Sequence, residues 1–213
     1  MAELVGPTGE VVGVERDANA LTKARSRVAE AQFRNVSFVE TDVSQVVNEV
    51  NSKPFDVVVG RLILQFLPDP GAVLRSLTKL VRPGGIIVIQ DCYWAPLLQL
   101  TADLPLWTKC ATLIHQTFEC SGAHMDMEHH LYRAFLDASL PKPKVMIEIP
   151  VGDSPDIRRW VYCTLFPEMQ GHNLPTADVG ELESLLSRLE AELDRTKSFA
   201  ACPGLIGAWS QVA

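Results

Sequence analysis

Residues 10–90 alternate between short β-branched runs and amphipathic helical segments, and this alternation constrains the fold more than any other feature. Between the apolar runs, apolar residues recur at helical spacing. A chain that alternates in this way builds a parallel sheet with right-handed crossovers. The strand-like runs are residues 10–15, 35–40, 55–60 and 86–90. The sequence therefore predicts an α/β, doubly wound sheet.

The helices between these runs have recognisable ends. Asp17 is placed to cap a helix that reaches about residue 31, and a short helix is expected at residues 44–50. LPDP at residues 67–70 begins a third helix, and RPGG at residues 82–85 stops it. The run FDVVVG is apolar at consecutive positions, so we expect a strand that is buried on both faces.

After residue 91 the alternation ends. Residues 92–119 are rich in leucine and aromatic residues and predict a loop and helix over the sheet edge. We interpret residues of about 92–140 and 153–175 as lid segments. Further expected elements are a helix at 127–139 with Asp126 as its N-cap, a strand at 144–150, a helix at 156–166, a long amphipathic helix at 176–197 and a last strand at 204–212.

Size and composition limit the class of protein. A chain of 213 residues with 47% hydrophobic residues buries one sizeable core, so we expect a single domain over residues 1–213. The net charge of −7 argues against nucleic acid or an anionic membrane as a partner. The first residues contain no leader pattern and no long apolar run follows, which predicts a soluble, cytoplasmic protein. Five scattered cysteines indicate neither a disulfide framework nor a zinc site.

Four segments, in this order, resemble the class I S-adenosylmethionine (SAM) dependent methyltransferases: VVGVERD, VETDV, FDVVVGRLILQFLPDP and LVRPGGIIVIQD. The resemblance is close over residues 1–91, and within the family it is closest to the small-molecule and quinone-type enzymes. Residues 144–150 and 204–212 resemble the family's terminal antiparallel hairpin more loosely. The resemblance implies a Rossmann-like methyltransferase sheet with a helical lid insertion, and SAM as the cofactor.

The resemblance also implies a SAM site at the carboxyl ends of the strands. An acid in this place accepts hydrogen bonds from ribose hydroxyls, and Glu15 occupies it. Asp42 is implied to accept from the adenine amino group, and the Val43 amide to donate to a ring nitrogen. The methionine portion is implied to lie at Gly60, Arg61 and Leu62. Two alternatives remain open, because Glu15 can be the first solvated position of a loop and Asp42 can cap the short helix.

In the family, a glycine-rich strand, turn and helix precede a segment similar to AELVGPTG, and this sequence starts at that segment. We therefore expect a sheet truncated at its N-terminus. The strands at 10–15 and 55–60 are expected to pair directly, to leave a groove or to receive a strand from another chain. SAM binding is expected to be weaker than usual for the family, or absent. A homodimer that covers the exposed sheet region is the expected assembly.

Other residues are candidates for chemistry. His115 and His172 are each placed in a lid segment, where a general base could deprotonate a hydroxyl acceptor. The candidate residues of an apolar substrate pocket are Gln65, Tyr93, Trp94, Trp107 and Trp160, with core packing as the alternative for the aromatic ones. Residues 124–130 (HMDMEHH) spread around a helix, so we expect a solvated polar face and no metal site.

Three functions are compatible with these features. The first is SAM-dependent methyl transfer to a small, largely apolar metabolite, as in secondary metabolism. The second is a SAM-independent enzyme on the same scaffold, which cyclises or rearranges a natural product. The third is a non-catalytic subunit that completes another protein's sheet. The acids Glu15 and Asp42 favour the first, and the missing glycine-rich turn favours the other two.

Overall fold

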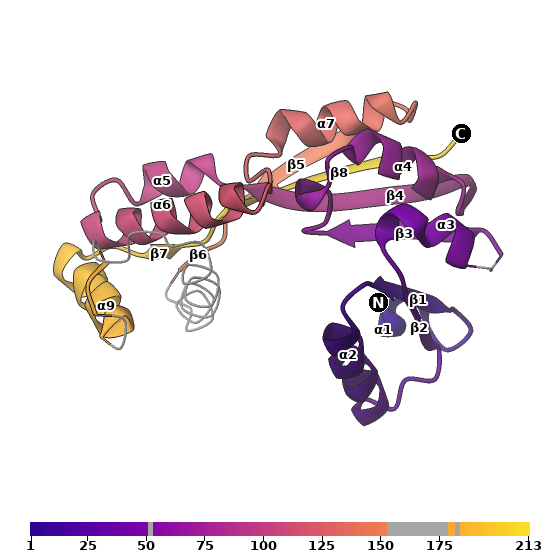
Figure 1. The fold of residues 1–213 in the computed structure, drawn as a ribbon, viewed down its shortest axis with the longest axis horizontal. Helices are drawn as coiled ribbons and strands as arrows, with labels where there is room; N and C mark the ends of the chain where they lie inside the picture. The colour runs from indigo at the N-terminus through magenta and orange to yellow at the C-terminus, as the bar shows by residue number, and fades with distance from the viewer. Residues whose placement is uncertain (51–52, 153–178, 182–183) are drawn as a thin grey trace.

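The computed structural model describes residues 1–50, 53–152, 179–181 and 184–213, and its elements are arranged as in Figure 1. The strands are β1 (Val11–Glu15), β2 (Val36–Glu40), β3 (Phe55–Arg61), β4 (Val81–Tyr93), β5 (Lys144–Glu148), β6 (Val151–Gly152), β7 (Ala200–Ala201) and β8 (Gly204–Gln211). The helices are α1 (Ala2–Val5), α2 (Ala18–Glu30), α3 (Val46–Glu49), α4 (Pro70–Thr78), α5 (Ala95–Leu100), α6 (Pro105–Cys120), α7 (Glu128–Asp137) and α9 (Leu185–Thr196), with 3₁₀ turns η1 (Val43–Gln45) and η2 (Leu64–Phe66).

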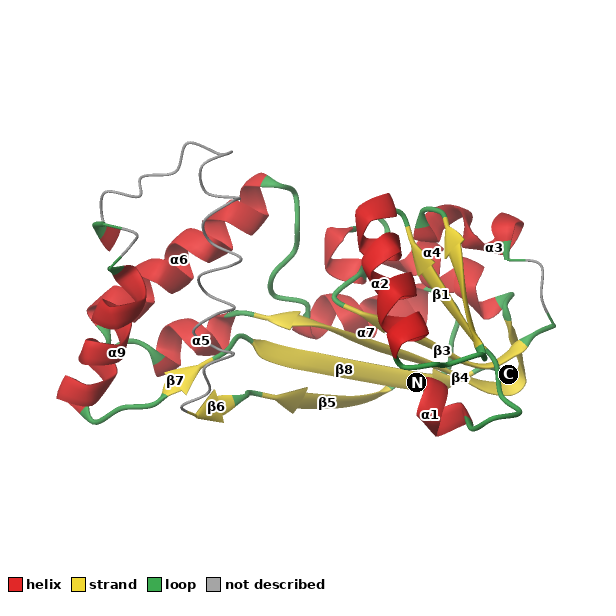
Figure 2. Cartoon of the chain, turned by 90° about the horizontal axis from the view of Figure 1, so that it is seen from below, coloured by secondary structure: helices red, strands yellow, loops and turns green. Residues whose placement is uncertain are grey.

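The main sheet has the strand order β3-β4-β8-β5. β3 and β4 are parallel, whereas β8 is antiparallel to both β4 and β5. Figure 2 shows β4, β8 and β5 running side by side along the length of the molecule. The predicted α/β fold with an antiparallel pair from the carboxyl-terminal part of the chain is therefore confirmed.

The β1–β2 pair forms a separate parallel sheet with α2 beside it. Asp17 caps α2 as expected, since its Oδ1 accepts a hydrogen bond from the Asn19 amide at 2.7 Å. Within the described residues β1 and β3 are not paired. This leaves the side chains of Val57 and Val59 42% and 52% exposed, so the expectation that β3 is buried on both faces is wrong. Val57 and Val59 point to one face of β3, whereas Val58 points to the other face and packs against the core that includes α4 and α7.

The RPGG segment behaves differently from its predicted role as a helix stop. α4 already ends at Thr78, and β4 continues through residues 82–85 with a register shift opposite Phe55 and Val57. Gly84 has φ 77°, and a Cβ on Gly85 would lie 2.8 Å from the Asp56 carbonyl oxygen. The two glycines thus allow an irregularity inside a strand of 13 residues.

Helices α4 and α7 pack on the main sheet and build its core. Asp69 Oδ1 caps α4 by accepting from the Ala72 amide at 2.8 Å. Leu74 of α4 and Phe135 of α7 are fully buried, as are Ile87 and Ala208 of the sheet. This core holds the carboxyl end of β4 in a fixed position.

A second apolar cluster lies beyond the end of β4, at the left of Figure 1. It joins α5, α6 and α9, so helices do form in the segment predicted as a lid. The long helix expected at 176–197 is not continuous, because Gly180 has φ 70° and is not helical, and α9 begins at Leu185. The helix expected at 156–166 lies outside the described residues.

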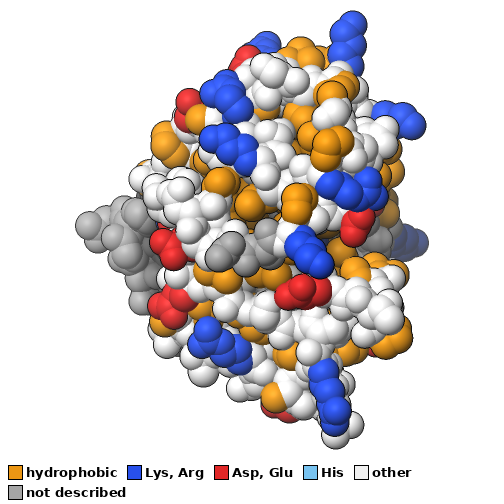
Figure 3. Space-filling view, turned by 90° about the vertical axis from the view of Figure 1, so that its right-hand side faces the viewer, with side chains coloured by type: hydrophobic (Ala, Val, Ile, Leu, Met, Phe, Trp, Pro, Cys, Tyr) orange, Lys and Arg blue, Asp and Glu red, His pale blue; other side chains and the backbone are white. Residues whose placement is uncertain are grey.

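The surface seen in Figure 3 carries scattered Lys, Arg, Asp and Glu side chains between apolar ones. In the described part of the chain, no helix is both long enough and apolar enough to cross a bilayer. Among the residues that the structure describes, the free thiols are Cys92, Cys110, Cys120 and Cys202, and Cys163 lies outside these residues. Burial raises the pKa of the Cys92 and Cys110 thiols to about 12, which keeps them protonated.

Candidate functional site

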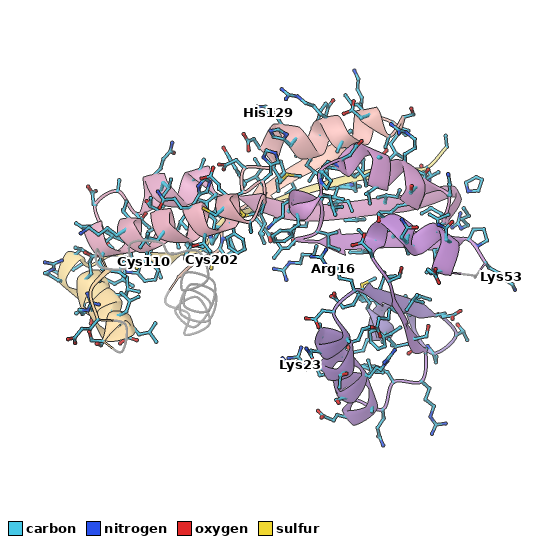
Figure 4. All side chains as sticks on the ribbon, viewed as in Figure 1. Arg16, Lys23, Lys53, Cys110, His129 and Cys202 are labelled. Carbon is cyan, nitrogen blue, oxygen red and sulfur yellow. The ribbon has the colours of Figure 1, made fainter. Side chains whose placement is uncertain are left out.

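Two predicted cofactor acids lie together at the carboxyl ends of β1 and β2. The strands pair with Glu15 opposite Glu40, and the Thr41 amide donates to the Glu15 carbonyl oxygen at 3.0 Å. Arg16, which Figure 4 labels between α2 and the main sheet, has Nη1 3.5 Å from Asp42 Oδ2. The structure therefore brings Glu15 and Asp42 to one edge of one sheet, as predicted.

Both acids also make the local contacts that the alternative interpretations require. Glu15 Oε1 accepts from the amides of Arg16 and Asp17 at 2.8 and 2.9 Å. Asp42 Oδ1 accepts from the Ser44 amide at 2.9 Å and caps η1, which begins at Val43. The Ser44 backbone amide, with smaller contributions from the Ser44 side chain and Arg16, lowers the pKa of Asp42. Each carboxylate uses one oxygen for these local contacts, while the second oxygen of Asp42 faces Arg16.

Gly60, Arg61 and Leu62 end β3 in the neighbouring sheet. A Cβ on Gly60 would lie 2.9 Å from Ile89 Cδ1, so glycine leaves room for the Ile89 side chain. Arg61 Nε donates to Gln90 Oε1 at 3.0 Å. Leu62 has φ 54° and donates its amide to the Gln90 carbonyl oxygen at 2.7 Å. A leucine in the left-handed region is uncommon and is kept there by its surroundings, which makes this turn a defined feature of the site.

Asp91 is the residue that the sequence analysis missed. Its side chain is fully buried at the end of β4, and its Oδ1 accepts from the Ile63 amide at 2.8 Å. Its Oδ2 is buried and has no hydrogen-bond partner in the part of the chain that is described. Burial raises the pKa of Asp91 to about 6, against the opposing effect of the amides of Ile63, Gln65 and Leu64. The available signal was an acid directly after the apolar run IIVIQ.

Gln65 stabilises the same turn after β3 through its hydrogen bonds. Its side chain is buried, and Oε1 accepts from the Cys92 amide at 2.9 Å. Its carbonyl oxygen accepts from the His124 amide at 2.7 Å. Gln65 and Asp91 together tie the turn after β3 to the end of β4, where the resemblance places the methionine portion of SAM.

His115 belongs to α6, and its ring lies between the carboxylates of Glu119 and Asp126. Nδ1 is 3.3 Å from Glu119 Oε2 and Nε2 is 3.5 Å from Asp126 Oδ2, and the ring lies 5.9 Å from that of Trp94. Both ring nitrogens are thus directed to protein carboxylates rather than into an open pocket. The role of His115 as a general base stays a prediction, and His172 lies outside the described residues.

Asp126 does not cap α7, so that prediction is wrong. Its Oδ1 accepts from the amides of Trp94 and Ala95 at 3.0 and 2.7 Å, at the start of α5, while α7 begins after Met127 without a side-chain cap. The antiparallel bridge between Tyr93 and Asp126 brings the carboxylate to α5 rather than to α7.

The candidate pocket residues separate into two environments. Trp94 and Trp107 are buried in the helical cluster, and Trp107 Nε1 donates to the Leu189 carbonyl oxygen at 3.2 Å, as a core residue does. Tyr93 instead lines a groove of about 300 Å³ with Glu128, Tyr132 and neighbouring apolar residues. Trp160 lies outside the described residues. The substrate roles of these residues stay predictions.

Histidines and acids do not converge on a metal site in the described ranges, where no group of three or more such ligands occurs. The rings of His124 and His130 stack at 4.9 Å, and Figure 4 shows His129 on α7, far from Arg16. The carboxyl ends of β1, β2, β3 and β4 therefore remain the best-defined concentration of polar groups.

Comparison with known proteins identifies the family. Residues 1–139 match a family model described as a methyltransferase domain. The chain belongs to the methyltransferase-domain family. An arsenite methyltransferase of Aquipseudomonas alcaligenes is 33% identical over 117 residues, which cover 52% of this chain and 34% of that protein. A demethylmenaquinone methyltransferase of Listeria monocytogenes is 34% identical over 91 residues, which cover 43% of this chain and 38% of that protein.

The match thus spans about a third of the length of these curated relatives.

Solved structures agree on the fold. A Bacillus halodurans protein assigned as a methyltransferase superposes with a TM-score of 0.60 at 12% identity. The aligned residues make up 95% of this chain and 82% of the Bacillus halodurans chain. The arsenic(III) S-adenosylmethionine methyltransferase of Chlamydomonas reinhardtii superposes with a TM-score of 0.55 at 18% identity. The aligned residues make up 100% of this chain and 58% of the Chlamydomonas chain. The predicted resemblance to class I SAM-dependent methyltransferases is confirmed.

Proposed function

We propose that this chain binds SAM and belongs to an enzyme that methylates a small, largely apolar metabolite. The observation that carries the proposal is the placement of Glu15 and Asp42 side by side at the carboxyl ends of two parallel strands, in a chain of the methyltransferase family. Ligands of open parallel sheets bind outside this edge. The relatives named for arsenite and for a menaquinone precursor support a small-molecule acceptor.

The side chains at this edge fit the cofactor. Glu15 Oε2 forms no hydrogen bond with the residues that the structure describes, so it is open to the ribose hydroxyls. Asp42, a carboxylate whose pKa is lowered further by the Ser44 amide, accepts from an exocyclic amine. The turn at Leu62, held by Asp91 and Gln65, positions the sulfonium end. SAM supplies an electrophilic methyl group, and the contribution of the chain is to align an acceptor with it and to exclude water.

The test is calorimetric titration of the 213-residue chain with SAM. We expect saturable binding that Glu15→Ala and Asp42→Ala each weaken by about tenfold or more, because each removes a charge-assisted hydrogen bond. The matched control is Glu10→Ala, an exposed acid just before the opposite end of β1. Absence of SAM binding by the unaltered chain contradicts the proposal, and so does an equal loss in Glu10→Ala.

A further inference from the structure

The main sheet ends in β5, and the outer edge of this strand is open. β5 pairs with β8 on one side and with no other strand among the described residues. All five residues of β5 are exposed, with Val145, Met146 and Ile147 exposed by 42%, 50% and 49%. Figure 2 shows β5 at the lower edge of the sheet, beside β8. An open edge with apolar side chains is a template for another strand.

The sequence of β5 is complementary to itself in the antiparallel direction. Reversing KVMIE places Lys144 opposite Glu148, Val145 opposite Ile147 and Met146 opposite Met146. Side chains alternate between the two faces of a strand, so residues at even spacing share a face. Lys144, Met146 and Glu148 therefore lie on one face and the two β-branched residues on the other. In an antiparallel pair with a second copy, the opposite charges of Lys144 and Glu148 therefore meet on one face, and the apolar side chains of Val145 and Ile147 meet on the other face.

We propose that two copies of this chain associate through β5, which pairs antiparallel with β5 of the second copy about a two-fold axis at Met146. Each Lys144 then faces Glu148 of the second copy, which gives two ion pairs, and the two sheets become continuous. This inference does not use the candidate SAM edge at Glu15 and Asp42, although Val145 and Ile147 of β5 also line the groove beside Tyr93.

The partners inside the chain leave these charges available. Lys144 forms no ion pair with any residue in the described ranges. Among the described residues, the neutral Gln90 side chain is the one donor to Glu148 Oε1, at 3.3 Å. Pro143 precedes the strand and Pro150 follows it closely. Proline cannot donate to a ladder, so the pairing is confined to the five residues of β5 and its register is limited.

The other edge strand of the main sheet, β3, does not fit a second copy in this way. Its charged residues are Asp56 and Arg61, which are five positions apart and therefore point to opposite faces. A two-fold antiparallel pair places residues of the same face opposite each other, so these two charges do not meet. Charge complementarity thus selects β5 as the interface.

Charge reversal tests the proposal. Lys144→Glu and Glu148→Lys each turn both ion pairs into like-charge contacts, and we expect the dimer dissociation constant from sedimentation equilibrium to rise about tenfold or more in each. An equimolar mixture of the two variants restores opposite charges at both positions, so it is expected to form a heterodimer. The double variant is expected to dimerise as the unaltered chain does.

The matched control is Lys142→Glu, the same charge change at an exposed lysine that precedes the strand, and it leaves dimerisation unchanged. The mixture also controls for folding, because misfolded variants do not rescue each other. A monomer at every concentration overturns the proposal. A dimer whose dissociation constant is unchanged by Lys144→Glu and by Glu148→Lys also overturns it, because the interface then lies elsewhere. A mixture of the two variants that stays monomeric overturns it as well.

Discussion

The β1–β2 sheet and the β3-β4-β8-β5 sheet are made from similar β-branched strands, yet they differ in how much they bury. α2 buries only Leu21 and β1 has no fully buried residue, whereas α4 buries four residues and β4 places Ile87 and Ile89 in a continuous core. The candidate adenosine acids belong to the less buried sheet. The turn that holds the methionine portion belongs to the well-packed one. Half of the candidate site is therefore fixed by its own core, and the other half depends more on strand pairing and caps.

The largest expected effect tests the core of the main sheet. Phe135→Ala removes a fully buried ring between α7 and the sheet, and we expect the free energy of unfolding to fall by about 3–5 kcal/mol in urea denaturation. The neighbouring Leu136→Ala is the control, since Leu136 is 42% exposed, and its cost is expected below about 0.5 kcal/mol. Equal costs would mean that α7 does not bury the face described above.

The second prediction concerns Asp91, where the well-packed sheet meets the site. Because its pKa is raised from 3.8 to about 6, the folded chain binds the proton more tightly than the unfolded chain does. The resulting stabilisation is complete below about pH 4 and is lost as the pH rises through about 6. The loss is on the order of 3 kcal/mol.

Asp91→Asn removes this titration. We expect the stability difference between variant and unaltered chain to change with pH over this window and to be constant above it, as measured by urea denaturation across a pH series. A difference that does not change with pH would show that Asp91 is ionised throughout, or that its second oxygen has found a donor.

Local signals account for most of what the sequence predicts correctly. Asp17 and Asp69 cap the helices that follow them, and these caps depend on residues two or three positions away. The alternation of strands and helices predicts parallel strands, and the β1–β2 and β3–β4 pairs are parallel. Which strands pair with each other is not predicted by the alternation.

The failures arise where a residue bonds to a distant part of the chain. Asp126 binds amides about thirty residues earlier, at α5, and the sequence pattern points only to the adjacent α7. The exposure of Val57 depends on which face of β3 packs against the core, which no local pattern records. The burial of Asp91 could not be predicted either, because it comes from tertiary packing around the end of β4.

The smallest expected effect concerns the ion pair at the ends of β1 and β2. Arg16 is largely exposed, so Arg16→Ala is expected to change the free energy of unfolding by less than about 0.5 kcal/mol. It should raise the pKa of Asp42 only slightly, because the Ser44 amide, the larger cause of the lowered pKa, still donates. Titration of the Asp42 carboxyl by NMR measures this shift, with Arg25→Ala on the exposed face of α2 as the control. A large rise in that pKa, or a large loss of stability, would show that charge rather than strand pairing holds the two acids together at this edge.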